Sequence, residues 1–317
     1  MDVVLPRRLT ILNTEELANL FVGIPGFPSA QETVDIGATG VSFVEPTGLA
    51  GLSATLRLLV EPTDQDCEIN WQHPADRNVR NYLARMDFLT EFGIDVSHGR
   101  RAAEGRFVEL HAIDFATRNV SNVLTSRLCS VAEANWDVNE SAVKLMSYGL
   151  GECIDNVVAH SASPIGGFTC AQAYRNRDAM QYAVSDSGIG IRASLAERYE
   201  LSSDAEAIKL ALEKHITGKL TGHAGEGLFV VREMVAANGG VLIVHSGNAL
   251  YQLDRGQRTG QIAEVPPFPG TVVGIELALR PDRSLADLFD VLFPEDAQEG
   301  WLAWPMEEGD EDAEHSR

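Results

Sequence analysis

A carboxylate, a carboxamide and an imidazole recur at four-residue intervals as Glu152, Asn156 and His160, within the segment Glu-Cys-Ile-Asp-Asn-Val-Val-Ala-His. On a helix this spacing stacks the three side chains on one face. The remaining positions are largely apolar, so the polar groups need partners, which a bound metal–phosphate group would supply. The same stripe is also typical of a solvated helix face, and the spacing alone leaves both interpretations open.

A second motif, Asp186-Ser-Gly188-Ile-Gly190-Ile191, follows the strand-like run at 182–184. Glycines after an aspartate permit a tight turn and a close approach of the backbone to a ligand. The aspartate can then accept a hydrogen bond from an exocyclic amine such as adenine N6. Taken alone, the motif is also typical of an ordinary Asp-Ser-Gly turn.

A third motif, Gly222-His-Ala-Gly225-Glu-Gly227-Leu228, opens a helix expected over about 226–237. Bare amides at a helix N-terminus and the positive end of the helix dipole favour an anion. No Gly-Lys-Ser/Thr follows, so this is not a Walker A loop, and the repeated βαβ units of a dinucleotide fold are also missing. In this order, the three motifs predict a pocket for an adenine nucleotide with its magnesium ion.

The formal net charge of the 317 residues is −21, with a sequence pI near 4.7. Such a surface repels nucleic acid and anionic lipid, so we expect neither as a partner, and a nucleotide must be held locally by amides and a divalent cation. The sequence has no apolar run of about eighteen residues, no secretory signal and no metal-like spacing among its four cysteines. These features favour a cytoplasmic protein.

Residues 1–99 alternate between strand and helix patterns and predict a small α/β domain, with a polar, glycine-containing linker at 98–105. The next part, 100–280, is expected to carry the nucleotide pocket. Residues 281–317 form an expected appendage with an acidic, disordered tail.

Three patterns define the expected architecture of residues 100–280. Residues 107–113 read as a strand, and 141–160 as a long helix with apolar residues on one side. Two strand-like runs at 168–175 and 179–184 are joined by Asn-Arg-Asp, which predicts a hairpin and therefore antiparallel pairing.

Together the motifs resemble the N, G1 and G2 boxes of the GHKL superfamily of ATP-binding domains, which includes gyrase, Hsp90, histidine kinases and MutL. The resemblance covers roughly residues 106–280, and its Glu-x-x-x-Asn-x-x-x-His form is most similar to the bacterial anti-sigma-factor serine kinases. It implies an α+β fold of the Bergerat type, an α/β sandwich with helices on one face of a mixed, largely antiparallel sheet. The hairpin expected from the residues agrees with this fold.

The resemblance also implies roles for particular side chains. Asn156 would hold Mg²⁺ through its side-chain oxygen, and Glu152 would be the general base that activates a hydroxyl or a water. Asp186 would read adenine N6, with Gly188 and Gly190 shaping the turn beneath the base.

Further contacts follow from the same resemblance. The phosphates would lie at the third motif, with Gly225, Gly227 and Leu228, beneath a mobile lid at 192–221. The resemblance also suggests, less specifically, that His160 lies near the phosphates and Thr271 near the adenine. The glycine loop departs from the commoner Gly-x-Gly-Leu-Gly-Leu, which puts its phosphate contacts in doubt.

Residues 41–52, Val-Ser-Phe-Val-Glu-Pro-Thr-Gly-Leu-Ala-Gly-Leu, faintly resemble the turn of STAS domains, the anti-sigma-factor antagonists. In those domains a GHKL kinase phosphorylates a serine in the turn. Here Glu45 and Pro46 stand in place of Asp and Ser, which leaves Thr47 as the only hydroxyl. A kinase-like domain fused to its own substrate-like domain is one interpretation, and a plain turn before a helix is the other.

We therefore expect an ATP-binding, partner-switching signalling protein with Ser/Thr kinase-like activity. A GHKL ATPase that uses hydrolysis and lid closure to move domains is an alternative, as is a nucleotide-sensing module without turnover. Glu152 permits the first two, because one base can serve a hydroxyl or a water. A protein partner is expected; members of the family often form homodimers, but no apolar seam in the sequence predicts one.

Overall fold

Five antiparallel strands form the central sheet in the order β6-β7-β8-β10-β9. The computed structural model describes residues 2–20, 33–60, 68–95, 105–114, 120–136, 140–213 and 227–278, without the side chains of 140–145. The strands are β6 (Phe107–Ile113), β7 (Gly167–Tyr174), β8 (Ala179–Asp186), β9 (Val241–Leu253) and β10 (Gln261–Ala278). The sheet and its helices confirm the expected α+β sandwich.

The expected hairpin is present as β7 and β8, joined by the 3-10 turn Arg175–Arg177. Its register pairs Gly167 with Asp186, so the second motif begins where β8 ends. On the next strand Thr271 lies opposite Asp186, and Ser246 of β9 lies opposite Thr271. Directly paired residues share a sheet face, so these three polar side chains form a row across β8, β10 and β9.

Three helices cover one face of this sheet: α5 (Val120–Asn135), α6 (Glu140–His160) and α9 (Gly227–Asn238). The apolar positions of α6 supply Leu150, Ile154 and Val157 to the core, each at most 3% exposed. They belong to one cluster with Tyr182 and Val184 of β8. The long helix expected at 141–160 is therefore confirmed, with its apolar side toward the sheet.

The other face of the sheet is covered by α1 (Thr14–Asn19) and α2 (Pro46–Val60), with α2 lying against β7, β8 and β10. The family resemblance implied helices on one face alone. This second face carries Phe168, Ala183 and Val272, and covering them removes their apolar surface from water. Almost every residue of α2 is buried, as in a helix at the centre of a core.

The N-terminal part also contains two small parallel sheets. The larger has the order β1-β3-β5, from β1 (Asp2–Val4), β3 (Thr33–Gly37) and β5 (Glu68–Gln72). The smaller pairs β2 (Arg8–Leu9) with β4 (Phe43–Val44). Strands and helices alternate along this part, as the sequence predicts for a small α/β unit.

The apolar spacing of Val79, Leu83, Met86 and Leu89 predicts a single helix over 78–92, but the structure has two helices, α3 (Arg77–Arg85) and α4 (Phe88–Glu91). Asp87 between them has a φ of 60°, a left-handed conformation that interrupts the helix. Both helices pack into the cluster that contains Leu52 of α2 and Phe168 of β7. The N-terminal part and the five-stranded sheet therefore share one apolar core.

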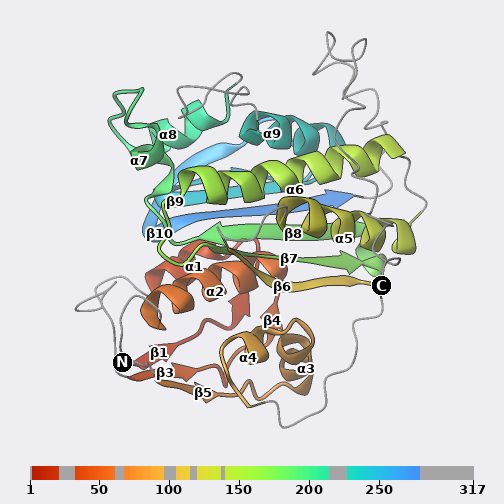
Figure 1. The fold of residues 1–317 in the computed structure, drawn as a ribbon, viewed down its shortest axis with the longest axis vertical. Helices are drawn as coiled ribbons and strands as arrows, with labels where there is room; N and C mark the ends of the chain where they lie inside the picture. Colours follow the sequence, from red (N-terminus) through yellow and green to blue (C-terminus); the bar gives the residue numbers. More distant parts are fainter. Residues whose placement is uncertain are drawn as a thin grey trace, which may run out of the picture.

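Figure 1 shows this arrangement, with the N-terminal segments in red to orange in its lower half and α6 and α9 in its upper half. The expected linker falls mostly on residues 96–104, outside the described residues, as does the appendage at 281–317. Within the described ranges, none of the helices combines the length and the apolar character needed to cross a membrane.

Candidate functional site

The first and third motifs meet where α6 passes the N-terminus of α9. A Cβ placed on Gly227 would overlap the carboxylate of Glu152 and lie 3.0 Å from its Cβ, so the start of α9 is in close contact with this side chain. Gly227 is also the first residue of α9, where the helix dipole is positive. The carboxylate of Glu152 is thereby placed beside the helix end that the sequence predicts as an anion site.

The second motif packs at the C-terminal end of α6. Ser161, directly after the helix, accepts a hydrogen bond from the Ile189 amide at 2.8 Å through its carbonyl oxygen. A Cβ on Gly188 would overlap that carbonyl, so the turn can pack here only with a glycine. The glycines of the second motif therefore permit contact with α6, besides shaping the turn.

Asp186 ends β8 and is 5% exposed. Its Oδ1 accepts a hydrogen bond from the Gly188 amide at 2.8 Å. Burial raises the pKa of Asp186 to about 7, and backbone hydrogen bonds from Gly188 and Thr271 only partly oppose this. The carboxyl group is thus desolvated and close to its ionisation midpoint at neutral pH, so a ligand that donates a hydrogen bond would favour its charged form.

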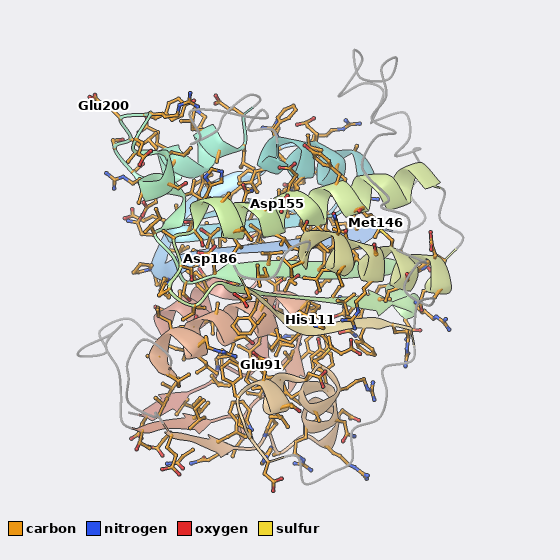
Figure 2. The ribbon with its side chains drawn as sticks, in the orientation of Figure 1. Glu91, His111, Met146, Asp155, Asp186 and Glu200 are labelled. Carbon is orange, nitrogen blue, oxygen red and sulfur yellow. The ribbon has the colours of Figure 1, made fainter. Side chains whose placement is uncertain are left out.

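Asn156 and His160 complete the row on α6, and both are half-buried. From Glu152 to His160 the row extends about 12 Å along the helix, at about 1.5 Å per residue. Its two ends are the contacts with Gly227 and with the turn at Gly188. In Figure 2, Asp155 marks α6 and Asp186 marks the nearby end of β8.

Ser246 is a polar residue of this region that the sequence analysis missed. Its hydroxyl oxygen accepts a hydrogen bond from the Ile191 amide at 2.9 Å and lies 3.0 Å from the Thr271 hydroxyl. The mainly apolar stretches at 241–245 and 250–253 predict two short strands, whereas β9 is one continuous strand that contains Ser246. A serine two residues after the apolar run at 241–244 was the available signal.

Two glycines of the third motif, Gly222 and Gly225, lie outside the described residues. Leu228 packs against the core beneath α6 and α9. Among the described residues, no group of three or more His, Cys, Asp or Glu side chains could hold a metal ion.

The structure describes the first part of the lid expected at 192–221, up to residue 213. These residues form α7 (Gly190–Leu195) and α8 (Asp204–Ala211), and Ile208 and Leu212 are buried in the core. The carboxylate of Asp204 also accepts a hydrogen bond from the Asn248 amide of β9 at 2.9 Å. This part of the expected lid therefore packs on the core and on β9, and residues 214–221 lie outside the described residues.

Thr47 is fully buried and packs on the sheet face opposite to Asp186. A Cβ on Gly274 of β10 would overlap the Thr47 side chain, so helix and sheet are in close contact here. The preceding Glu45 accepts from the Ile11 amide at 3.2 Å and pairs with Arg177 at 3.2 Å. The Thr47 hydroxyl therefore lies on the side of the sheet away from α6.

No protein-family model matches the chain, and no curated protein matches it either. The candidate site therefore stands on its own geometry. That geometry is a row of three polar side chains on α6, with a glycine-led helix end beside one end of the row and a buried carboxyl group near the other.

Proposed function

We propose that this chain binds Mg-ATP and acts as a partner-switching signalling protein with Ser/Thr kinase-like activity. The observation that carries the proposal is the meeting of three segments that lie far apart in sequence. Glu152 contacts the start of α9, Ser161 binds the turn at Gly188, and Asp186 is buried at the end of β8.

The base-binding end would be Asp186 with its neighbour Thr271. An adenine N6 amine would donate to the Asp186 carboxylate and offset the cost of ionising a buried acid. A guanine presents a carbonyl oxygen at the same position and would meet a second acceptor. This chemistry favours adenine nucleotides over guanine nucleotides.

The phosphate end would lie between Asn156 and the N-terminus of α9. Asn156 would hold the magnesium ion, which when bound neutralises phosphate charge. The first amides of α9 would face the phosphates. Glu152, beside that helix end, would take a proton from the attacking hydroxyl or water.

The burial of Thr47 directs the proposed transfer away from the chain itself and toward a hydroxyl on a separate protein. Hydrolysis of ATP with water as the acceptor is the second candidate, and the same position of Glu152 favours it, because one base can serve either acceptor. In both cases the bound nucleotide would control contact with the partner protein.

Titration calorimetry with ATP and magnesium tests the proposal, with Asp186→Ala as the matched variant. We expect saturable binding that depends on the adenine base of the nucleotide and is lost in Asp186→Ala. Incubation with γ-labelled ATP then separates the activities: free phosphate identifies an ATPase, and label on an added partner identifies a kinase. If the wild-type protein binds no adenine nucleotide at millimolar concentrations, the proposed function is wrong.

A further inference from the structure

Ser246 lies at the β9 end of the polar row formed with Asp186 and Thr271, and it is 2% exposed. Its hydroxyl makes three contacts that join separate segments. It accepts from the Ile191 amide at 2.9 Å, donates to the Gly270 carbonyl at 3.1 Å, and lies 3.0 Å from the Thr271 hydroxyl. One buried hydroxyl thus links α7, at the end of the second motif, to β10.

These contacts hold both the turn that follows Asp186 and the hydroxyl of Thr271, which are two parts of the proposed base-binding end. The turn that follows Asp186 reaches α7 through Gly190, whose φ of 75° is left-handed. A Cβ at Gly190 would lie 3.0 Å from the Ser246 hydroxyl, so the turn is packed tightly on this serine. The hydroxyl of Thr271 is held beside Asp186 by the same oxygen.

We propose that Ser246 is a positioning residue for the base of the nucleotide. It keeps the turn after Asp186 at the end of β8 and restricts the rotation of the Thr271 hydroxyl, so that both groups face the base together. This inference rests on the proposed function, since it assigns the base-binding end of the same site. Ser246 itself is covered by its three partners and is not required to touch the ligand.

Ser185 offers a matched control. It is also a fully buried serine within the sheet, and its hydroxyl also bonds to β10, at the Thr271 carbonyl, over 3.2 Å. However, it lies one residue before Asp186 on β8, so its side chain faces α2 on the other side of the sheet. Losing either hydroxyl removes a buried hydrogen bond to β10, but only one loss affects the proposed base-binding end.

The test measures the affinities for adenosine and for ADP, together with thermal unfolding, in Ser246→Ala and Ser185→Ala. Removing the Ser246 hydroxyl should weaken the binding of adenosine and of ADP by the same factor, about tenfold. The factor is the same because the change affects only the contacts with the adenine base, which both ligands share. Ser185→Ala should leave both affinities within about twofold of wild type. A Thr271→Val background should abolish much of the Ser246→Ala effect, because the two hydroxyls act together.

Equal losses of affinity in the two serine variants would overturn the inference, because the effect would then follow general stability. So would a Ser246→Ala protein with wild-type affinity for adenosine, or effects of Ser246→Ala and Thr271→Val that simply add. A wild-type protein that binds neither adenosine nor ADP would instead refute the proposed function. Loss of adenosine binding in Asp186→Ala without an effect of Ser246→Ala would leave the proposed function standing and refute the role of Ser246.

Discussion

The side chains of the adjacent residues Asp186 and Ser187 lie on opposite sides of the five-stranded sheet. The Asp186 carboxyl group lies on the side of α6, where it accepts from the Gly188 amide. The Ser187 hydroxyl donates to the Ala54 carbonyl of α2 at 2.9 Å on the other side. The proposed base-binding residue is therefore directly attached to the contact that holds the N-terminal part on the sheet.

Asp186→Asn should stabilise the ligand-free protein above neutral pH. Burial raises the pKa of Asp186 from 3.8 to about 7. Between about pH 4 and about pH 7 the folded protein therefore retains a proton that the unfolded chain has released. Stability contributed by this group therefore falls as the pH rises from about 4 to about 7. At about pH 8 the substitution should raise the free energy of unfolding by up to about 4 kcal/mol, at about 1.4 kcal/mol for each pKa unit.

Urea unfolding at about pH 5 and about pH 8 measures this effect. Wild type should lose stability between the two values relative to Asp186→Asn. An unchanged difference between the proteins at both pH values would show that the Asp186 carboxyl group is not strongly desolvated.

Adenosine binding should weaken as the pH falls. The ionised Asp186 accepts the hydrogen bond from N6, and with a pKa of about 7 only about a tenth of the carboxyl groups are ionised at about pH 6. The affinity should therefore fall roughly tenfold from about pH 8 to about pH 6. Adenosine is used in calorimetry because it carries no phosphate that titrates in this range, and Asp186→Asn should show a flat profile.

Glu152→Gln should retain Mg-ATP binding and lose turnover. The amide keeps the size of the side chain beside Gly227 but cannot take a proton, so hydrolysis or transfer should fall by about 10²- to 10⁴-fold. Asp155→Asn is the control, since Asp155 is an exposed carboxylate on the same helix. Equal turnover in Glu152→Gln and wild type would show that the base lies elsewhere.

Gly274→Ala should destabilise the contact between the N-terminal part and the sheet. The added methyl group would overlap the buried Thr47 side chain, and such overpacking typically costs about 1–3 kcal/mol. At Gly40 an added Cβ meets nothing within 4 Å, so Gly40→Ala should change the unfolding free energy by less than about 0.5 kcal/mol. Similar melting temperatures for the two variants would contradict the close packing of α2 on β10.

Much of the local structure could be predicted from the sequence. The periodicity of α6, the hairpin of β7 and β8 and the strand β6 were each expected within a few residues of their observed bounds. These elements depend on contacts between residues that are close along the chain. The three motifs were also found this way, because each consists of residues at short, fixed spacings.

Helical periodicity does not say what a helix packs against. The pattern at 204–215 predicts a helix, and α8 covers 204–211 of it, but its position in the core was not predicted. Ile208 is buried because α8 packs on β9 and β10, which come from later parts of the chain. Ser246 was missed for a similar reason, since its three partners lie on other segments.

The sequence by itself determined most of the elements, the three motifs and the side chains on one face of α6, because these follow from the spacing of residues along one segment. Only the tertiary structure decided that α2 lies on the second face of the sheet, that Thr47 is buried there, and that Ser246 joins Ile191 to Thr271. Those features arise from contacts between segments up to hundreds of residues apart. Their physical cause is the removal of two apolar sheet faces from water at once, which no single segment encodes.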